Sequence, residues 1–463
     1  MRKPVARMLC ATLFAVGGVA FAAGAAPVAV SPAERHALAP EIAVGPRGTI
    51  DVIWLDKQPL EDAARAAAAA AQAAPAAAAP NHEGHGPPAA GGDRHLSSMD
   101  LWFARSSDGG ASFGPATRVN AQSGQVWGFA VSKPKIAVGR SGTIHVVYPA
   151  NAIAPAFDKP VLVMYYTRST DGGATFEAPR RLHQLPDLDQ SQFMDGGFTS
   201  AHAFGTVGVA PDGSVHAIWV DTRSMKAGDS AAAAYAAVSR DDGRTFTQEQ
   251  VALPEGVCPC CQITIAFDAR SRMYVGSRHV TGDGFRNSTV ARVAATGSEQ
   301  LGETVMIGTK AWKLEGCPLK PTVVAVDGRN IYTAAFNGAE APPGAYFSMS
   351  RDGGRTFQPA FALHPDAAVS DAPALAVARG TVLVAWHAKA AGNPRRVYWR
   401  AIQTRSGRAG AVVELAAPEG PAQSPALATR PDGRVQVVWQ QGERIYTTTL
   451  DPKSAPSATV ASR

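Results

Sequence analysis

The sequence predicts an all-β chain folded as a β-propeller, a ring of four-stranded antiparallel sheets called blades. Two internal repeats indicate this fold class: a short turn motif that occurs four times and a strand–turn–strand pattern that occurs seven times. Most copies of the second pattern are about 50 to 70 residues apart, which suits four short strands and their loops. The chain has 463 residues, 46% of them hydrophobic, which is enough for a large buried core.

The N-terminal segment, residues 1–25, is typical of a signal peptide. A basic start precedes the apolar run MLCATLFAVGGVAFA, and the small residues after it suit cleavage after Ala22 or Ala25. We therefore expect an exported protein, periplasmic or secreted, without a transmembrane anchor after cleavage, and we expect it to be a monomer. Without the three basic residues of this segment the formal charge falls from +6 to +3, which does not indicate a nucleic-acid partner.

The turn motif has the form S-x-D-x-G-x-[ST]-F, and each copy follows an alternating apolar stretch that reads as a strand. Its aspartate can accept hydrogen bonds from donors within the turn, and its glycine supplies a backbone conformation closed to other residues. We interpret the motif as a structural hairpin between the third and fourth strands of a blade. The four aspartates are Asp108, Asp171, Asp241 and Asp352.

The strand–turn–strand pattern indicates how many blades the ring contains. Its copies start near residues 40, 134, 205, 261, 321, 372 and 425, so seven blades are favoured and six are the alternative. The last copy ends after its third strand, RIYTTTL, and the segment around Val30 can supply the fourth strand and close the ring. The expected propeller domain is 26–452, followed by a flexible tail, 453–463.

The four turn motifs resemble the Asp-box (BNR) repeats of the sialidase superfamily, and the resemblance covers nearly all of residues 30–450. It implies the propeller fold and, as an enzyme, an exo-α-sialidase-type glycoside hydrolase acting on a carbohydrate. It also implies three arginines that grip a carboxylate and a tyrosine nucleophile, but an R-I-P-type segment is not found here. The candidates by residue type and position are Arg223, Arg278, Arg400 and Tyr346.

The cysteines predict a second kind of site. Removal of the signal peptide leaves four, of which Cys258, Cys260 and Cys261 lie in EGVCPCC and Cys317 lies in EGCPLKP. Each segment immediately precedes the first strand of a predicted blade, and the two blades are adjacent. Both connections therefore open on the rim opposite the repeated turns, and we expect the four thiols to form one cluster.

Histidines are expected on the same rim. The first strand–turn–strand copy is followed by an insertion, 57–98, with an alanine-rich first half and a glycine-, proline- and histidine-rich second half. The insertion carries His82, His85 and His95, and His279 lies at the predicted rim end of a strand.

The cysteine cluster has several interpretations. An even number of cysteines in an exported chain suits two disulfides. Thiolates with imidazoles suit a copper or zinc ion, and one disulfide with two free thiols is a mixed case. A catalytic thiol with His279 as its base is a further possibility. The leading hypothesis is a propeller that binds a soft metal through this cluster; the rivals are the glycoside hydrolase and a non-catalytic scaffold for protein interaction.

Overall fold

The computed structural model describes most of the expected propeller domain. The described residues are 26–57, 99–130, 132–154, 159–183, 202–225, 229–293, 304–316, 318–389, 394–415, 418 and 420–456. The predicted signal peptide, the histidines His82, His85 and His95, and Cys317 lie outside them. Regular structure in the described residues is almost entirely β-strand, with one short 3-10 turn, η2 (Pro452–Ser454). Within the described residues, no helix is long and apolar enough to cross a membrane.

The described strands form five four-stranded sheets and one eight-stranded sheet. The eight-stranded sheet contains two successive groups of four strands, joined where Val257 of β13 pairs with His279 of β15. We number the four-strand groups units 1 to 7 along the chain. Units 1 to 3 are β2 (Ala37–Val44), β3 (Ile50–Asp56), β4 (Asp100–Ser106), β5 (Thr117–Arg118); β6 (Lys135–Val138), β7 (Ile144–Ala154), β8 (Lys159–Ser169), β9 (Arg180–Arg181); and β10 (His202–Val209), β11 (Val215–Asp221), β12 (Ala232–Ser239), β13 (Gln250–Val257).

The remaining units follow the same antiparallel order. Units 4 and 5 are β14 (Thr264–Phe267), β15 (Met273–Val280), β16 (Arg286–Val293), β17 (Thr304–Met306); and β18 (Thr322–Asp327), β19 (Asn330–Asn337), β20 (Gly344–Ser350), β21 (Phe361–Ala362). Units 6 and 7 are β22 (Val369–Ala378), β23 (Thr381–Lys389), β24 (Arg396–Gln403), β25 (Val413–Glu414); and β26 (Ala422–Thr429), β27 (Val435–Gln441), β28 (Arg444–Leu450), β1 (Val28–Ala29).

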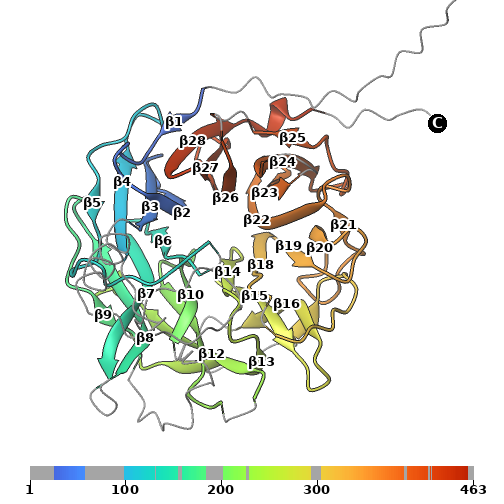
Figure 1. The fold of residues 1–463 in the computed structure, drawn as a ribbon, viewed down its shortest axis with the longest axis horizontal. Coiled ribbons are helices and arrows are strands. Elements are labelled where there is room, and N and C mark those ends of the chain that lie inside the picture. The colour runs from blue at the N-terminus through green and yellow to red at the C-terminus, as the bar shows by residue number, and fades with distance from the viewer. Residues whose placement is uncertain are drawn as a thin grey trace, which may run out of the picture.

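The units are arranged as a β-propeller. Figure 1 shows the sheets around a central axis, with the first strands β2, β18, β22 and β26 toward the middle. Each first strand contacts the first strand of the next unit, and β26 contacts β2. The N-terminal β1 pairs antiparallel with β28, through Val28 opposite Thr447 and Ala29 opposite Tyr446.

The core lies between neighbouring sheets rather than within one sheet. The second strands of units 1 and 3, β3 and β11, are buried at every position, because each has another unit on either side. A tryptophan occupies an equivalent place in the second strand of four units, and large rings of this kind supply much of the buried apolar area. These fully buried residues are Trp54, Trp219, Trp386 and Trp439.

The four repeated turns share one hydrogen-bond pattern. In the first copy, Ser106 Oγ donates to Asp108 Oδ1 at 2.7 Å, and Ser112 Oγ donates to Asp108 Oδ2 at 2.6 Å. The amide of Gly110 donates to Ser106 Oγ at 2.8 Å. Equivalent bonds recur around Asp171, Asp241 and Asp352. Each turn lies between the third and fourth strands of its unit, so all four lie on one rim of the ring.

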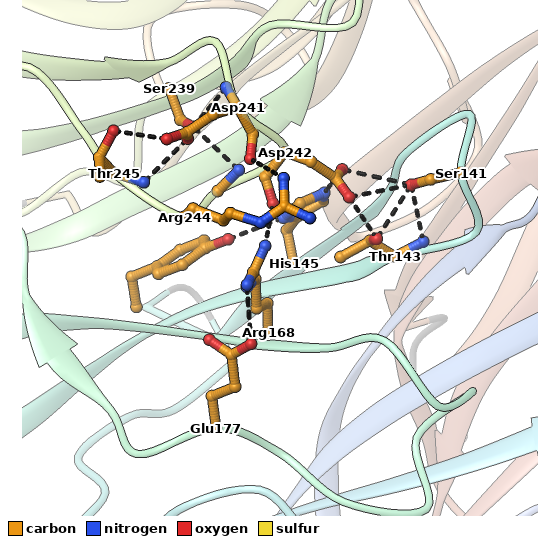
Figure 2. A network of polar contacts seen from close by, with 12 residues as sticks. Ser141, Thr143, His145, Arg168, Glu177, Ser239, Asp241, Asp242, Arg244 and Thr245 are labelled. Atoms are coloured by element: carbon orange, nitrogen blue, oxygen red, sulfur yellow. Dashed lines mark hydrogen bonds and ion pairs between the residues drawn. The ribbon is translucent and has the colours of Figure 1, made fainter.

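Polar contacts on this rim also join neighbouring units, as Figure 2 shows for units 2 and 3. Asp242, in the repeated turn of unit 3, accepts a hydrogen bond from Thr143 Oγ1 of unit 2 at 2.6 Å and lies 3.5 Å from His145 Nε2. Arg168 of unit 2 donates to the Asp242 carbonyl at 2.7 Å. The side chain and the backbone carbonyl of one residue, Asp242, therefore both contact the neighbouring unit.

Three buried histidines make the fold sensitive to acid. His145, His216 and His387 are 0%, 1% and 9% exposed, and burial lowers the pKa of each to about 4 from the ordinary value of 6.5. Between pH 6.5 and 4 the unfolded chain binds more protons at these positions than the folded chain does. Stability is therefore lost as the pH falls through this window, by up to about 3 kcal/mol for each histidine.

We predict that the free energy of unfolding in urea falls steeply between pH 6.5 and pH 4.5. The aspartates of the repeated turns have lowered pKa values, so they remain ionised in this window and do not cause the loss. The substitution His216→Gln retains a nitrogen donor near Ser214 and removes one titrating group, so it should reduce the slope by about a third. Equal stability at pH 7 and pH 4.5 would contradict this assignment.

Candidate functional site

The cysteine segment forms a buried turn between β13 and β14, on the rim opposite the repeated turns. The amide of Cys261 donates to the carbonyl of Cys258 at 3.4 Å, and Pro259 occupies the position where its fixed φ favours such a turn. The amide of Cys258 donates to the carbonyl of Arg278 on β15 at 2.8 Å. These bonds fix the turn to unit 4, and all three cysteines are at most 4% exposed.

The turn brings three sulfur atoms together. The sulfurs of Cys258, Cys260 and Cys261 all lie within 4.8 Å of one another, and those of Cys258 and Cys260 are 3.5 Å apart. Cys258 and Cys261 are free thiols. At least two of the three cysteines in the turn therefore retain thiol chemistry.

Two buried guanidinium groups face the sulfurs. Arg286, at the start of β16, donates from Nη1 to Cys258 Sγ at 3.4 Å, and it is 7% exposed. Arg278 is 1% exposed and donates to the carbonyl oxygens of Arg286, Phe336 and Lys320 at 2.7, 2.8 and 3.2 Å. Its guanidinium carbon also lies 5.2 Å from the centre of the Trp312 ring. Buried cations require nearby negative charge, and thiolates can supply it here.

The electrostatics of the turn separate the two free thiols. A hydrogen bond from Cys261 lowers the pKa of Cys258 to about 6, and the Cys260 backbone and the charges of Arg286 and Arg278 act in the same direction against burial. Burial raises the pKa of Cys261 well above its ordinary value, as does its bond to Cys258. Near neutral pH the pair therefore carries one negative charge, on Cys258.

The connection that contains Cys317 approaches the same turn. Leu319 packs against the apolar cluster that includes the three cysteines. The backbone of Lys320 is within hydrogen-bonding reach of Cys261 and accepts a bond from Arg278. The two connections that were predicted to be neighbours are thus in contact through their described residues.

His279 lies near the turn but outside the sulfur group. It pairs with Val257 on the neighbouring strand and lines a cavity of about 530 Å³ together with Glu255 and Gly256. A β-carbon on Gly256 would lie 2.0 Å from His279 Cε1, so the histidine ring depends on this glycine for its place. Burial lowers the pKa of His279, which favours the neutral imidazole.

The candidate residues for a sialidase-like site each form hydrogen bonds with other groups of the chain. Arg223 binds both oxygens of Asp221, at 3.0 and 2.7 Å, and contacts Glu249 at 3.2 Å. Arg400 donates to the carbonyls of Gly410 and Leu363, and the Tyr346 hydroxyl donates to the Pro342 carbonyl at 2.8 Å. Arg278 belongs to the cysteine site described above.

Arg286 and the charged lining of the central channel were not among the residues predicted from the sequence. Arg286 could have been found, because it begins a third strand and therefore lies on the cysteine rim. In the channel, a cavity of about 210 Å³ is lined by the first strands and includes Glu41, Lys133 and Lys135. Burial lowers the pKa of Lys133 to about 8, and Glu41 lies 3.3 Å from its ammonium group.

Solved structures resemble this chain only weakly, with TM-scores below 0.5 and sequence identities of 8 to 14% among the three compared below. No family model matches the chain, and no curated protein matches it. A Hadza microbial sialidase, Hz136, has a TM-score of 0.48 at 13% identity over 90% of this chain and 66% of its own length. A protein of unknown function from Dyadobacter fermentans has a TM-score of 0.49 at 14% identity, over 92% of this chain and 98% of its own.

The NanB sialidase of Streptococcus pneumoniae has a TM-score of 0.44 at 8% identity, over 94% of this chain and 70% of its own length. At these values the likeness does not assign an activity to this chain. The propeller architecture rests on the strand pairing of the chain itself.

We predict that Arg278→Met lowers the free energy of unfolding by at least about 3 kcal/mol, because three buried carbonyls lose their donor. Urea unfolding measures the change. Arg270→Met is the matched control: Arg270 is exposed, and its replacement should cost less than about 0.5 kcal/mol. Wild-type stability in Arg278→Met would contradict this structural role for the arginine.

Proposed function

We propose that this chain is an exported propeller that binds a soft metal ion through the thiolates of Cys258 and Cys261. Copper(I) is the favoured ion and zinc(II) is the alternative. The observation that carries the proposal is the pair of free, buried thiols within 4.8 Å of each other, faced by two buried guanidinium groups. Thiolates are the ligands that copper(I) prefers in proteins.

The charge balance favours a monovalent ion. Two thiolates with copper(I) carry a net charge of −1, which the guanidinium groups of Arg278 and Arg286 offset. Two thiolates with zinc(II) are neutral and leave both buried cations without an anion at the turn, which is costly. The N–H donors of Arg286 and of the surrounding backbone would orient the sulfurs, as outer hydrogen bonds do at metal sites.

We further propose that Cys260 forms a disulfide with Cys317, which corresponds to the mixed case. Two observations support it: the free cysteines of the turn are Cys258 and Cys261 and not Cys260, and Leu319 and Lys320, close to Cys317 in sequence, pack against that turn. Such a bridge would close a loop across units 4 and 5 and restrict the unfolded chain. Export to an oxidising compartment suits this pairing.

The same proposal includes a complete ring. Counting both halves of the eight-stranded sheet gives seven blades, and the β1–β28 pairing would close the ring. Lys57 and Met99, the described residues on either side of the insertion, follow β3 and precede β4, at strand ends on the rim of the cysteine turn. We propose that His82, His85 and His95, which lie outside the described residues, capture ions for delivery to the buried sulfurs.

A sialidase-type glycoside hydrolase is the weaker proposal. It needs arginines that are available to grip a substrate carboxylate. Arg223 already binds two carboxylates of the chain, and Arg278 binds three backbone carbonyls. A scaffold for protein interaction has no specific observation in its favour.

We predict that the mature chain, with Cys258 and Cys261 as thiols and the Cys260–Cys317 bridge intact, binds one copper(I) ion, measured by competition with a chromogenic copper(I) chelator under anaerobic conditions. The double substitution C258S/C261S should weaken binding at least 100-fold, because hydroxyl groups are poor ligands for a soft ion. His279→Gln is the matched control and should bind as the wild type does. Unchanged affinity in C258S/C261S, in a variant whose circular dichroism shows a folded chain, would overturn the proposal.

A thiol titration tests the disulfide separately. In denaturant without reductant, the mature chain should expose two reactive thiols, and after full reduction it should expose four. Two disulfides would give none before reduction, and four free cysteines would give four in both conditions. Either result would exclude the mixed case.

A further inference from the structure

A cavity lies on the rim of the repeated turns, at one of two equivalent junctions between units. Strand register makes the junction of units 2 and 3 equivalent to that of units 4 and 5. In unit 2, His145 is the second residue of β7 and pairs with Arg168. In unit 4, Tyr274 is the second residue of β15 and pairs with Arg292.

The repeated turns that complete these junctions differ at one position. The turn of unit 3 reads SRDDGRTF, and the turn of unit 5 reads SRDGGRTF, so Gly353 stands where Asp242 stands in the other turn. Asp242 fills its junction, since its carboxylate lies against Thr143 and His145 (Figure 2). Gly353 has no side chain to do so.

The junction of units 4 and 5 is correspondingly open. A cavity of about 430 Å³ lies there, and a β-carbon on Gly353 would have Tyr274 Oη as its nearest neighbour, at 3.9 Å. The volume is within the range of sites for small molecules. Five arginines line the cavity: Arg270, Arg272, Arg292, Arg329 and Arg355.

The cavity has an excess of positive charge. Its two carboxylates are already bound: Asp268 pairs with Arg272 at 2.6 Å, and Asp352 accepts bonds within its own turn. Five guanidinium groups against two carboxylates leave a net charge of +3. Within the described residues, Arg270, Arg292 and Arg329 are exposed and have no side-chain hydrogen bond or ion pair.

We propose that this cavity binds a multiply charged oxyanion, a phosphate or sulfate ester, which takes the place that the Asp242 carboxylate occupies at the equivalent junction. Guanidinium groups form paired hydrogen bonds with the oxygens of such anions. The site lies on the opposite rim from the cysteine turn and is independent of the metal proposal.

The difference between the two turns supplies the test. Gly353 has φ of +79°, and Asp242 has φ of +61°, so an aspartate can adopt the backbone conformation that this position requires. Gly353→Asp should therefore place a carboxylate in the cavity without unfolding the turn. Gly353→Asn adds nearly the same volume without the charge and is the matched control.

Isothermal titration calorimetry of the mature chain with inorganic triphosphate and, separately, with a sulfated disaccharide measures binding at low ionic strength. We expect binding of at least one probe at micromolar concentration, weakened by added salt. Gly353→Asp and Arg292→Ala should each weaken it at least tenfold, and Gly353→Asn should weaken it less than Gly353→Asp does. Tighter binding of one probe would identify its ester class as the ligand.

Three results would overturn the proposal. The first is the absence of binding by both probes at millimolar concentration. The second is equal affinity in the wild type and Gly353→Asp, provided that both have the same unfolding midpoint. The third is an equal loss in Gly353→Asp and Gly353→Asn, since the loss would then come from volume and not from charge.

Discussion

The burial of Arg278 and Arg286 beside three sulfur atoms is the constraint on which the account of this protein depends. A guanidinium group without water needs hydrogen-bond acceptors and negative charge, and its cost is high when either is missing. Arg278 obtains its acceptors from three backbone carbonyls in units 4 and 5, so it holds these units together. The thiols can supply negative charge at the turn, and Asp371 adds to it at Arg278.

The packing of the propeller stabilises the fold against the cost of burying two guanidinium groups. Units 1 and 3 bury their whole second strand between two neighbours, and the four repeated turns stabilise the opposite rim by hydrogen bonds that do not involve the cysteine site. The connection between units 3 and 4 carries the thiols and also contributes to the core, since its three cysteines belong to a buried apolar cluster. The cysteine turn and the arginine cavity lie one on each rim.

Much of the fold was predictable because its signals are local and repeated. The alternating stretches, the turns and the strand that pairs with RIYTTTL could be read from the sequence, and so could the location of the cysteine turn between a fourth and a first strand. The residues that surround the cysteine turn could not be predicted from the sequence. Arg278 was a candidate for gripping a substrate, and only the fold shows that its guanidinium group is buried against carbonyls. The contrast between Gly353 and Asp242 was visible in the repeats, but its meaning required the register of two distant strands.

The central claim is that Cys258 and Cys261 together hold a soft ion. X-ray absorption spectroscopy at the copper edge, on the mature chain loaded with one equivalent of copper(I), tests it most directly. A first shell of two sulfur atoms and no nitrogen is expected. A shell dominated by nitrogen would place the ion on histidines instead and would exclude a site on Cys258 and Cys261.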